Sequence, residues 1–403
     1  MRSKWTILAL FVSIGALNYA DRTAVASLFP LLRTDLGLTD VGMALTGSLF
    51  LWSYAAGSPF AGRLADRFNR RRLVLGSLIA WSAVTAVSGL VTEAWQLQAL
   101  RLVLGASECL YLPAALAILA EFHGNDTRAT AMGMHSAGLT FGMIAGGTLA
   151  GFLGQQYGWR PAFFVLGGAG FALALLASVI LPDTRAHALQ SEPEPVSDTL
   201  RALFGTRLYR VILTEAALIA IGSWIFANWL PLYFSDVHGL TLAAAGFSGT
   251  AALTAGRTTG AMLGGVFSDR FSAGETPRRM LLQGSFYLAA APLLLVFAVK
   301  APLATVGMAI FLHGLILGAG VANEMPVLCD ALPAHRRSTA IGIMNAMNTF
   351  MGGLAILVSG VLKSNAELST MFAADSVIVM AAGLVCLWGR RAQLQSAALA
   401  AKA

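Results

Sequence analysis

Charged residues are scarce in this chain. Asp, Glu, Lys and Arg make up 12% of its 403 residues, whereas hydrophobic residues make up 57%. Soluble domains carry roughly 25% charged residues, so too few charges are present to cover a water-facing surface of this size. The composition therefore excludes an ordinary soluble protein and indicates one that is embedded in a lipid bilayer. The 42 glycines agree, because small residues let membrane helices pack closely.

Cysteine and the common catalytic motifs are nearly absent. The three cysteines, Cys109, Cys329 and Cys386, lack the paired spacing of a disulfide framework or a metal cluster. No glycine-rich phosphate loop with its lysine is present, which excludes an ATP-driven pump on this chain alone. No nucleophile–base motif stands out either. We therefore expect no cofactor, no metal and no enzymatic activity.

Long apolar segments account for most of the sequence. A helix needs about 20 largely apolar residues to cross the hydrocarbon of a bilayer. The first segment follows a charged N-terminus, as in a signal peptide, but more spans follow and we interpret it as an uncleaved first helix. Twelve spans are predicted, near residues 5–29, 41–61, 73–91, 96–121, 130–153, 159–181, 208–234, 243–267, 279–299, 302–328, 338–362 and 368–390.

A polar segment divides these spans into two sets of six. We predict an N-terminal six-helix bundle over residues 1–181, a cytoplasmic linker over 182–207 and a C-terminal six-helix bundle over 208–403. The predicted fold class is thus an all-α integral membrane protein, and we expect it to be a monomer.

The basic residues set the predicted topology. Lys and Arg stay on the cytoplasmic side in short loops, and the loops after the second, eighth and tenth spans are rich in Arg. Both termini are therefore predicted to be cytoplasmic, in a cell membrane such as the bacterial inner membrane. The formal net charge of +7 then reflects topology, and no nucleic-acid partner is expected.

The two halves repeat one another. The segment Gly62–Phe68 (GRLADRF) recurs as Gly265–Phe271 (GVFSDRF), and Arg128–Gly133 (RATAMG) recurs as Arg337–Gly342 (RSTAIG), at offsets of 203 and 209 residues. Two tandem copies of one orientation suit a substrate site at their interface and alternating access by rocking.

These motifs resemble the major facilitator superfamily. Its loop signature, Gly-x-x-x-Asp-Arg-x-x-Arg-Arg, matches the residues from Gly62 to Arg71. Within the superfamily the chain resembles the anion:cation symporter family of organic-anion and sugar-acid transporters, through Asn18–Arg22 (NYADR) and a run from Arg101 to Phe163. The segment from Asn323 to Ala340 looks at least as much like the spinster-type lipid transporters. The resemblance implies the major-facilitator-type fold of 12 transmembrane helices in two six-helix bundles.

Four ionisable residues lie deep in predicted spans of the first half, where charge is costly and marks function. Asp21 and Arg22 belong to the first span, and Arg101 and Glu108, seven residues apart, share one face of the fourth. Burial favours a neutral carboxyl group whereas a nearby Arg favours the charged one, so a carboxylate there can exchange protons. Arg stays charged and its planar fork suits a substrate carboxylate.

Two readings of these four charges stay open. They either handle substrate and protons or form structural ion pairs. The resemblance implies proton-binding carboxylates at Asp21 and Glu108 and an anion-contacting Arg at Arg22 or Arg101. Asn18 shares the face of Arg22, and with Tyr19 it completes the predicted substrate contacts of the first span.

The second half supplies further candidates. Arg257 either clamps the far end of the anion or pairs with Glu324, which is a third candidate for proton coupling. Asn228 and Asn345 are predicted to line the cavity. A gating role is predicted for charges at the cytoplasmic helix ends, namely Asp66, Arg67, Arg71, Asp269 and Arg270.

The sequence therefore predicts a secondary transporter whose partners are the lipid bilayer, a small anionic substrate and protons. The leading hypothesis is proton-coupled symport of a sugar acid or another carboxylate. A spinster-like carrier of lysolipids or amphiphiles and a drug efflux pump are the alternatives.

Overall fold

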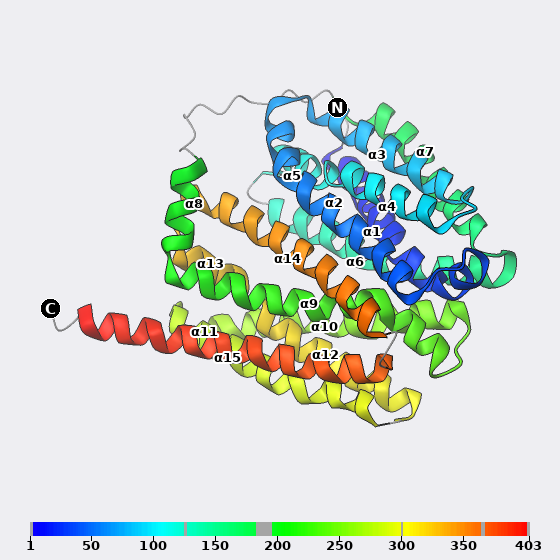
Figure 1. The fold of residues 1–403 in the computed structure, drawn as a ribbon. Coiled ribbons are helices and arrows are strands. Elements are labelled where there is room, and N and C mark those ends of the chain that lie inside the picture. The colour runs from blue at the N-terminus through cyan, green and yellow to red at the C-terminus, as the bar shows by residue number, and fades with distance from the viewer. Residues whose placement is uncertain (1–2, 125–126, 183–195, 300, 364–366, 401–403) are drawn as a thin grey trace. The chain divides into compact units, whose positions relative to one another are not determined.

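The computed structural model describes residues 3–124, 127–182, 196–299, 301–363 and 367–400. All regular structure in these residues is helical (Figure 1). The helices before the central polar segment are α1 Lys4–Asp35, α2 Asp40–Arg67, α3 Arg70–Ser88, α4 Ala94–Glu108, α5 Tyr111–Phe122, α6 Arg128–Tyr157 and α7 Arg160–Ile180.

The rest of the described chain begins with a short amphipathic helix, α8 Val196–Gly205, within the segment predicted as a linker. The elements that follow are α9 Arg207–Asp236, α10 Leu242–Ser272, α11 Thr276–Ala290, the 3₁₀ helix η1 Ala291–Ala298, α12 Leu303–Val321, α13 Glu324–Ala331, α14 Ala334–Lys363 and α15 Leu368–Ala400. Each of the twelve predicted spans falls on one of these helices or on two successive ones. The predicted fold class is confirmed.

Two spans predicted as single helices are interrupted at matching prolines. The helix α4 ends at Glu108 and α5 begins at Tyr111, and α12 likewise ends at Val321 before α13. Pro113 and Pro326 are each the third residue of the second piece. A proline has no N–H to donate to the backbone carbonyl four residues earlier. For Pro113 and Pro326 those carbonyls belong to Cys109 and Ala322, which are the C-cap residues of α4 and α12. Glu108 thereby becomes the last residue of its helix.

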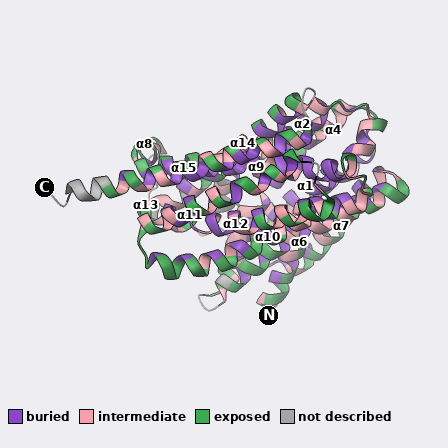
Figure 2. Ribbon diagram, turned by 90° about the horizontal axis from the view of Figure 1, so that it is seen from below, coloured by how far each residue is buried: buried purple, intermediate pink, exposed green. Residues whose placement is uncertain are grey.

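Eight helical segments in the described chain are long and apolar enough to cross a membrane. Figure 2 shows exposed residues spread along the helices, and many of them are large and apolar, among them Leu102, Phe141, Leu175 and Met262. Such a surface suits lipid rather than water. The other four predicted spans correspond to α1, α2, α3 and α10, which are less hydropathic because they carry more polar and charged residues.

The chain folds into two compact units. Unit 1 comprises residues 1–191, 227–250 and 356–364, and unit 2 comprises residues 192–226, 251–355 and 365–403. Parts of α9, α10 and α14 therefore belong to unit 1. In unit 1, α1 packs on α6, α3 on α7 and α2 on α4, whereas in unit 2 α11 packs on α15 and α12.

Glycines make the close approach of α1 and α6 possible. Gly138, Gly142 and Gly146 recur every four residues, so they lie on one face of α6. A Cβ atom at Gly142 would overlap the backbone carbonyl of Ala16, and one at Gly138 would lie 2.9 Å from the carbonyl oxygen of Val12. The packing that fixes α1, and with it Asp21 and Arg22, therefore depends on these glycines, because any side chain at their positions would collide with the backbone of α1.

A substitution on this face should destabilise the protein. We expect Gly142→Ala to lower the free energy of unfolding by about 1–3 kcal/mol, the usual cost of overpacking, and to lower the midpoint of thermal unfolding in detergent. The matched control is Gly133→Ala in the same helix, where an added Cβ meets nothing within 4 Å. Equal midpoints for the two variants would contradict this account of the packing.

Candidate functional site

Of the four ionisable residues predicted to matter in the first half, three are buried in unit 1 and the fourth, Arg22, is partly buried. Their residues expose 3% (Asp21), 3% (Arg101) and 1% (Glu108) of their surface, whereas the Arg22 side chain keeps 11%. Arg22 is therefore the most accessible charge of this group, and we call Asp21, Arg22, Arg101 and Glu108 the first-half charge cluster.

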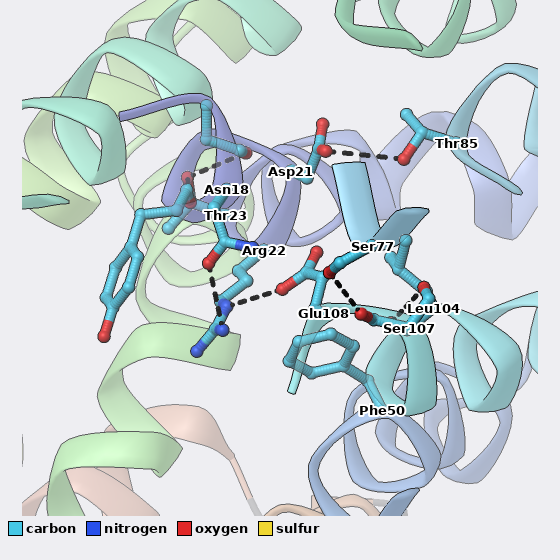
Figure 3. Close-up of polar contacts among 12 residues, drawn as sticks. Asn18, Asp21, Arg22, Thr23, Phe50, Ser77, Thr85, Leu104, Ser107 and Glu108 are labelled. Carbon is cyan, nitrogen blue, oxygen red and sulfur yellow. Dashed lines mark hydrogen bonds and ion pairs between the residues drawn. The ribbon is translucent and has the colours of Figure 1, made fainter. Parts of the chain in front are cut away.

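Arg22 and Glu108 form the central ion pair of this cluster. The Arg22 Nε atom donates to Glu108 Oε2 at 3.0 Å, and Arg22 Nη2 donates to Asn18 Oδ1 at 3.1 Å (Figure 3). Asn18 lies one helical turn before Arg22 on α1, so the two side chains share a face. The guanidinium is thereby oriented by its own helix and held by the last residue of α4.

Aromatic rings surround the guanidinium of Arg22. Its Cζ atom lies 4.6 Å from the ring centroid of Tyr19, 4.6 Å from that of Tyr54 and 5.2 Å from that of Phe50. Cation–π attraction at such distances contributes about 0.5–2 kcal/mol, more when the cation is desolvated. The rings of α1 and α2 thus stabilise a charge that would otherwise be costly to bury.

The seven-residue spacing of Arg101 and Glu108 suggests that their side chains interact, but Arg101 contacts other groups. Its Nε atom donates to the backbone carbonyl of Thr46 at 3.2 Å, and its Cζ atom lies 4.6 Å from the ring centroid of Phe50. The described contacts include no ion pair between Arg101 and Glu108, although the two residues share a helix face. Phe50 therefore lies against both guanidiniums of the cluster.

Both carboxylates keep one oxygen free of hydrogen bonds. Thr85 Oγ1 donates to Asp21 Oδ2 at 3.4 Å (Figure 3), whereas Asp21 Oδ1 and Glu108 Oε1 are buried and have no hydrogen-bond partner in the described structure. A buried acceptor without a donor is costly. Protonation would remove the negative charge that is costly to bury, so each carboxyl group is a chemically suitable place for a proton.

The remaining predicted substrate residues are divided between the two units. Asn228 belongs to unit 1, where its Oδ1 atom lies 2.6 Å from the position that a Cβ would take at Gly47. In unit 2, the Arg257 Nη1 atom donates to Ser223 Oγ at 2.9 Å, and Asn345 is exposed on α14. Glu324 is buried at the start of α13, and no ion pair between it and Arg257 occurs among the described contacts.

Two of the predicted gating residues, Arg71 and Asp269, form contacts within single units. The side chains of Asp66 and Arg67 lie outside the described residues. Arg71 donates to the backbone carbonyl of Ser178. Asp269 pairs with Arg279 of α11 at 2.8 Å, and Arg270 is exposed. Their gating role stays a prediction.

A second group of charges, absent from the sequence predictions, joins other helix ends in unit 1. Asp40 at the start of α2 pairs with Lys363 at the end of α14 and with Arg33 of α1. The Arg33 Nη1 atom also lies 3.7 Å from Asp236 of α9. Sequence reasoning gave these residues no role because each falls in a predicted connection rather than inside a span.

Sequence reasoning also overlooked Tyr54 and two buried acids, Glu215 and Asp375, which expose 1% and 2% of their surface. Both acids fall inside predicted spans, so the criterion that selected Asp21 and Glu108 could have found them. Nothing in the sequence distinguishes Tyr54 from an aromatic residue of the core or of the lipid belt.

The match to a known protein family extends over nearly the whole chain. The family model of the major facilitator superfamily matches residues 11–257 and 249–402. The chain belongs to this superfamily. The prediction made from the loop signature and the internal repeat is confirmed.

Several superfamily members with named functions are similar to the chain. The probable galactarate/D-glucarate transporter of Bacillus subtilis is 26% identical over 66% of this chain, and that match covers 65% of the relative. Another probable galactarate/D-glucarate transporter, from Escherichia coli, is 25% identical over 90% of this chain and 89% of its own. The cis,cis-muconate transport protein of Acinetobacter baylyi is 26% identical over 95% and 92%.

A solved structure is similar in fold. It is a bacterial homologue of the human lysosomal transporter Spinster, in an inward-facing and unoccupied conformation, with a TM-score of 0.78 and 20% sequence identity over 97% of this chain and 98% of that one. At this identity the likeness concerns the fold alone.

The burial of the Arg22–Glu108 pair predicts strong coupling. In a double-mutant cycle with Arg22→Met and Glu108→Gln, the free energies of unfolding should be non-additive by about 1–3 kcal/mol. The control cycle uses Arg279→Met and Asp269→Asn, because the Asp269 side chain is 69% exposed and exposed pairs couple by about 1 kcal/mol or less. Similar coupling in both cycles would refute the central position given to Arg22 and Glu108.

Proposed function

We propose that this protein is a secondary transporter that carries a small organic dicarboxylate across a bacterial inner membrane together with protons, by alternating access. The superfamily assignment and the named functions of the similar proteins support the transport of small organic acids. The chemistry of the first-half charge cluster supports the proton.

The substrate class follows from what the named substrates share. Galactarate, D-glucarate and cis,cis-muconate each carry two carboxylates, but differ in their hydroxyl groups and unsaturation. A site for such compounds must bind a carboxylate, which a guanidinium does, but it need not recognise one particular arrangement of hydroxyl groups. Bidentate hydrogen bonding to a carboxylate is the particular strength of Arg.

Arg22 is the group proposed to bind one substrate carboxylate. It is the most accessible of the four cluster charges, its Nε and Nη2 atoms already hold acceptors, and aromatic rings stabilise its charge. A substrate carboxylate can take the place of Glu108 at this guanidinium. The contact that carries the proposal is therefore the buried ion pair between Arg22 and Glu108.

Coupling to a proton follows from the charge of the cluster. Asp21 and Glu108 formally balance Arg22 and Arg101, so an added substrate carboxylate leaves one excess negative charge in a buried site. Such a charge is costly, and protonation of Glu108 removes it. The proton then binds the carboxylate that the substrate displaces, and substrate and proton enter the site together.

Counterflow in proteoliposomes tests the substrate class. Vesicles loaded with galactarate should accumulate labelled galactarate, and dicarboxylates should compete for uptake, whereas monocarboxylates, cationic drugs and lysolipids should not. Counterflow driven by a lysolipid but not by any dicarboxylate would overturn the proposal in favour of a spinster-like carrier. Counterflow driven only by cationic drugs would overturn it in favour of an efflux pump.

The role of Glu108 predicts a change in pH dependence. In the unaltered protein, uptake should rise as the pH falls, because a protonated Glu108 releases Arg22 for the substrate. In Glu108→Gln the side chain stays neutral. Counterflow should then continue without dependence on pH. Accumulation driven by a pH gradient should be lost, because Gln at this position cannot take up or release a proton.

The matched control is Glu121→Gln, because Glu121 is a half-exposed acid of α5 that pairs with Arg70. This variant should keep both accumulation and its pH dependence. Gradient-driven accumulation that persists undiminished in Glu108→Gln would assign Glu108 a structural role.

A further inference from the structure

Unit 2 buries a carboxyl group that no ion pair compensates. Asp375 lies on α15 inside a predicted span and exposes 2% of its surface. Its Oδ1 atom is buried and has no hydrogen-bond partner, and no ion pair of Asp375 occurs among the described contacts. By contrast, Glu108 is held by Arg22, and Glu215 accepts a hydrogen bond from Gln283 at 2.7 Å. The proposed transport leaves Asp375 without a role.

The carboxyl group of Asp375 lies directly against the backbone of α9 at Gly222. A Cβ atom built on Gly222 would lie 2.2 Å from Asp375 Oδ2, 2.6 Å from Oδ1 and 2.7 Å from Cγ. These distances are too short for any real contact, so the carboxyl group fills the space that a side chain at position 222 would need. A glycine at this position therefore allows α15 to place an acid on α9.

Aromatic rings pack one turn away on both helices. Phe372 precedes Asp375 by three residues, so the two share a face of α15. On α9, Phe226 follows Gly222 by four residues and shares its face. The two rings stack with centroids 4.6 Å apart, and Phe297 of η1 lies 4.9 Å from Phe372. The acid thus lies beside a buried aromatic cluster, where an ionised carboxylate is costly.

The other titratable groups that neighbouring elements carry inside the predicted spans do not compensate Asp375. They are Glu215 of α9, Arg257 of α10, Tyr287 of α11, His313 of α12, Glu324 of α13 and Cys386 of α15. Arg257 donates to Ser223 Oγ at 2.9 Å, and His313 Nδ1 donates to the backbone carbonyl of Ala290 at 3.0 Å. None of the six acts electrostatically on Asp375. Among the described residues, no cation therefore balances an ionised Asp375.

We propose that Asp375 is a proton-binding site, and that its bound proton keeps α15 packed against α9. An ionised carboxylate needs water or a cation, whereas the neutral acid fits beside Gly222 and the aromatic rings. Loss of the proton therefore favours separation of the two helices, which lets water reach the carboxylate. This proton is distinct from the one proposed at Glu108, because the two acids belong to different units.

The helix that Asp375 contacts is shared by both units. Residues of α9 up to Phe226 belong to unit 2, and those from Ala227 onward belong to unit 1. Gly222 lies one helical turn before this change. A proton that fixes α9 on α15 therefore acts where the shared helix leaves unit 2, and an alkaline pH, by removing the proton, loosens α9 at that point.

Infrared difference spectroscopy on the full-length protein in nanodiscs tests the proton in the absence of substrate. A protonated carboxyl group has a C=O stretching band that an ionised one lacks. At neutral pH we expect Asp375→Asn to lose the intensity of one such band. The control is Asp269→Asn, at a side chain that is 69% exposed, which should keep the full intensity. Full intensity in Asp375→Asn as well would overturn the proton site.

Thermal unfolding of the same samples tests whether the proton holds the helices together. The midpoint of the unaltered protein should fall as the pH rises from mildly acidic to alkaline, because stability that depends on a bound proton is lost when the proton leaves. Asn has no proton to lose, so the midpoint of Asp375→Asn should fall less steeply, whereas Asp269→Asn should follow the unaltered protein. Equal slopes for Asp375→Asn and the unaltered protein would overturn the role of the proton.

Two glycine variants test whether the contact with α9 is the cause. Gly222→Ala displaces the carboxyl group, so the C=O band that is lost in Asp375→Asn should shift in frequency. Gly307→Ala, also in unit 2, should leave the band unchanged, because an added Cβ there meets nothing within 4 Å. An unshifted band in Gly222→Ala protein that elutes as the unaltered protein does would overturn the contact.

Discussion

The ion pair between Arg22 and Glu108 is the interaction on which the rest of the first-half site depends. A membrane-embedded chain with few charges buries three of them beside the partly buried Arg22, and this pair links α1 to the end of α4. The glycine face of α6 fixes α1, the interruption at Cys109 makes Glu108 a helix end, and three aromatic rings enclose the guanidinium. Together these features stabilise a charge inside the helix bundle.

Buried acids occur in both halves of the sequence. In the first-half cluster the carboxylates and guanidiniums are equal in number. In unit 2, Glu215 and Glu324 are also buried, and the Glu215 carboxylate accepts a hydrogen bond from Gln283. Glu108 and Glu324 each lie next to a proline-associated helix break, at Pro113 and at Pro326. Interrupted helices at membrane depth are tolerated where they line a polar site, and the repeat has placed one in each half.

Sequence reasoning predicted the spans and the charged positions well, but not the contacts. The twelve spans could be predicted because apolar length is a direct requirement of the bilayer. The spacing of Arg101 and Glu108 correctly placed them on one face, yet Glu108 pairs with Arg22 of another helix and Arg101 donates to Thr46. Such partners depend on how helices pack, which periodicity does not specify. The breaks after Glu108 and Val321 were also not predicted, although both prolines are visible in the sequence.

The central claim is that substrate and proton move together because a substrate carboxylate displaces Glu108 from Arg22. The most direct measurement is of protons moved by substrate. An inward galactarate gradient is imposed on proteoliposomes that contain a pH-sensitive dye and have no initial pH gradient. The account predicts acidification of the vesicle interior by the unaltered protein and none by Glu108→Gln. Galactarate entry without acidification would contradict it.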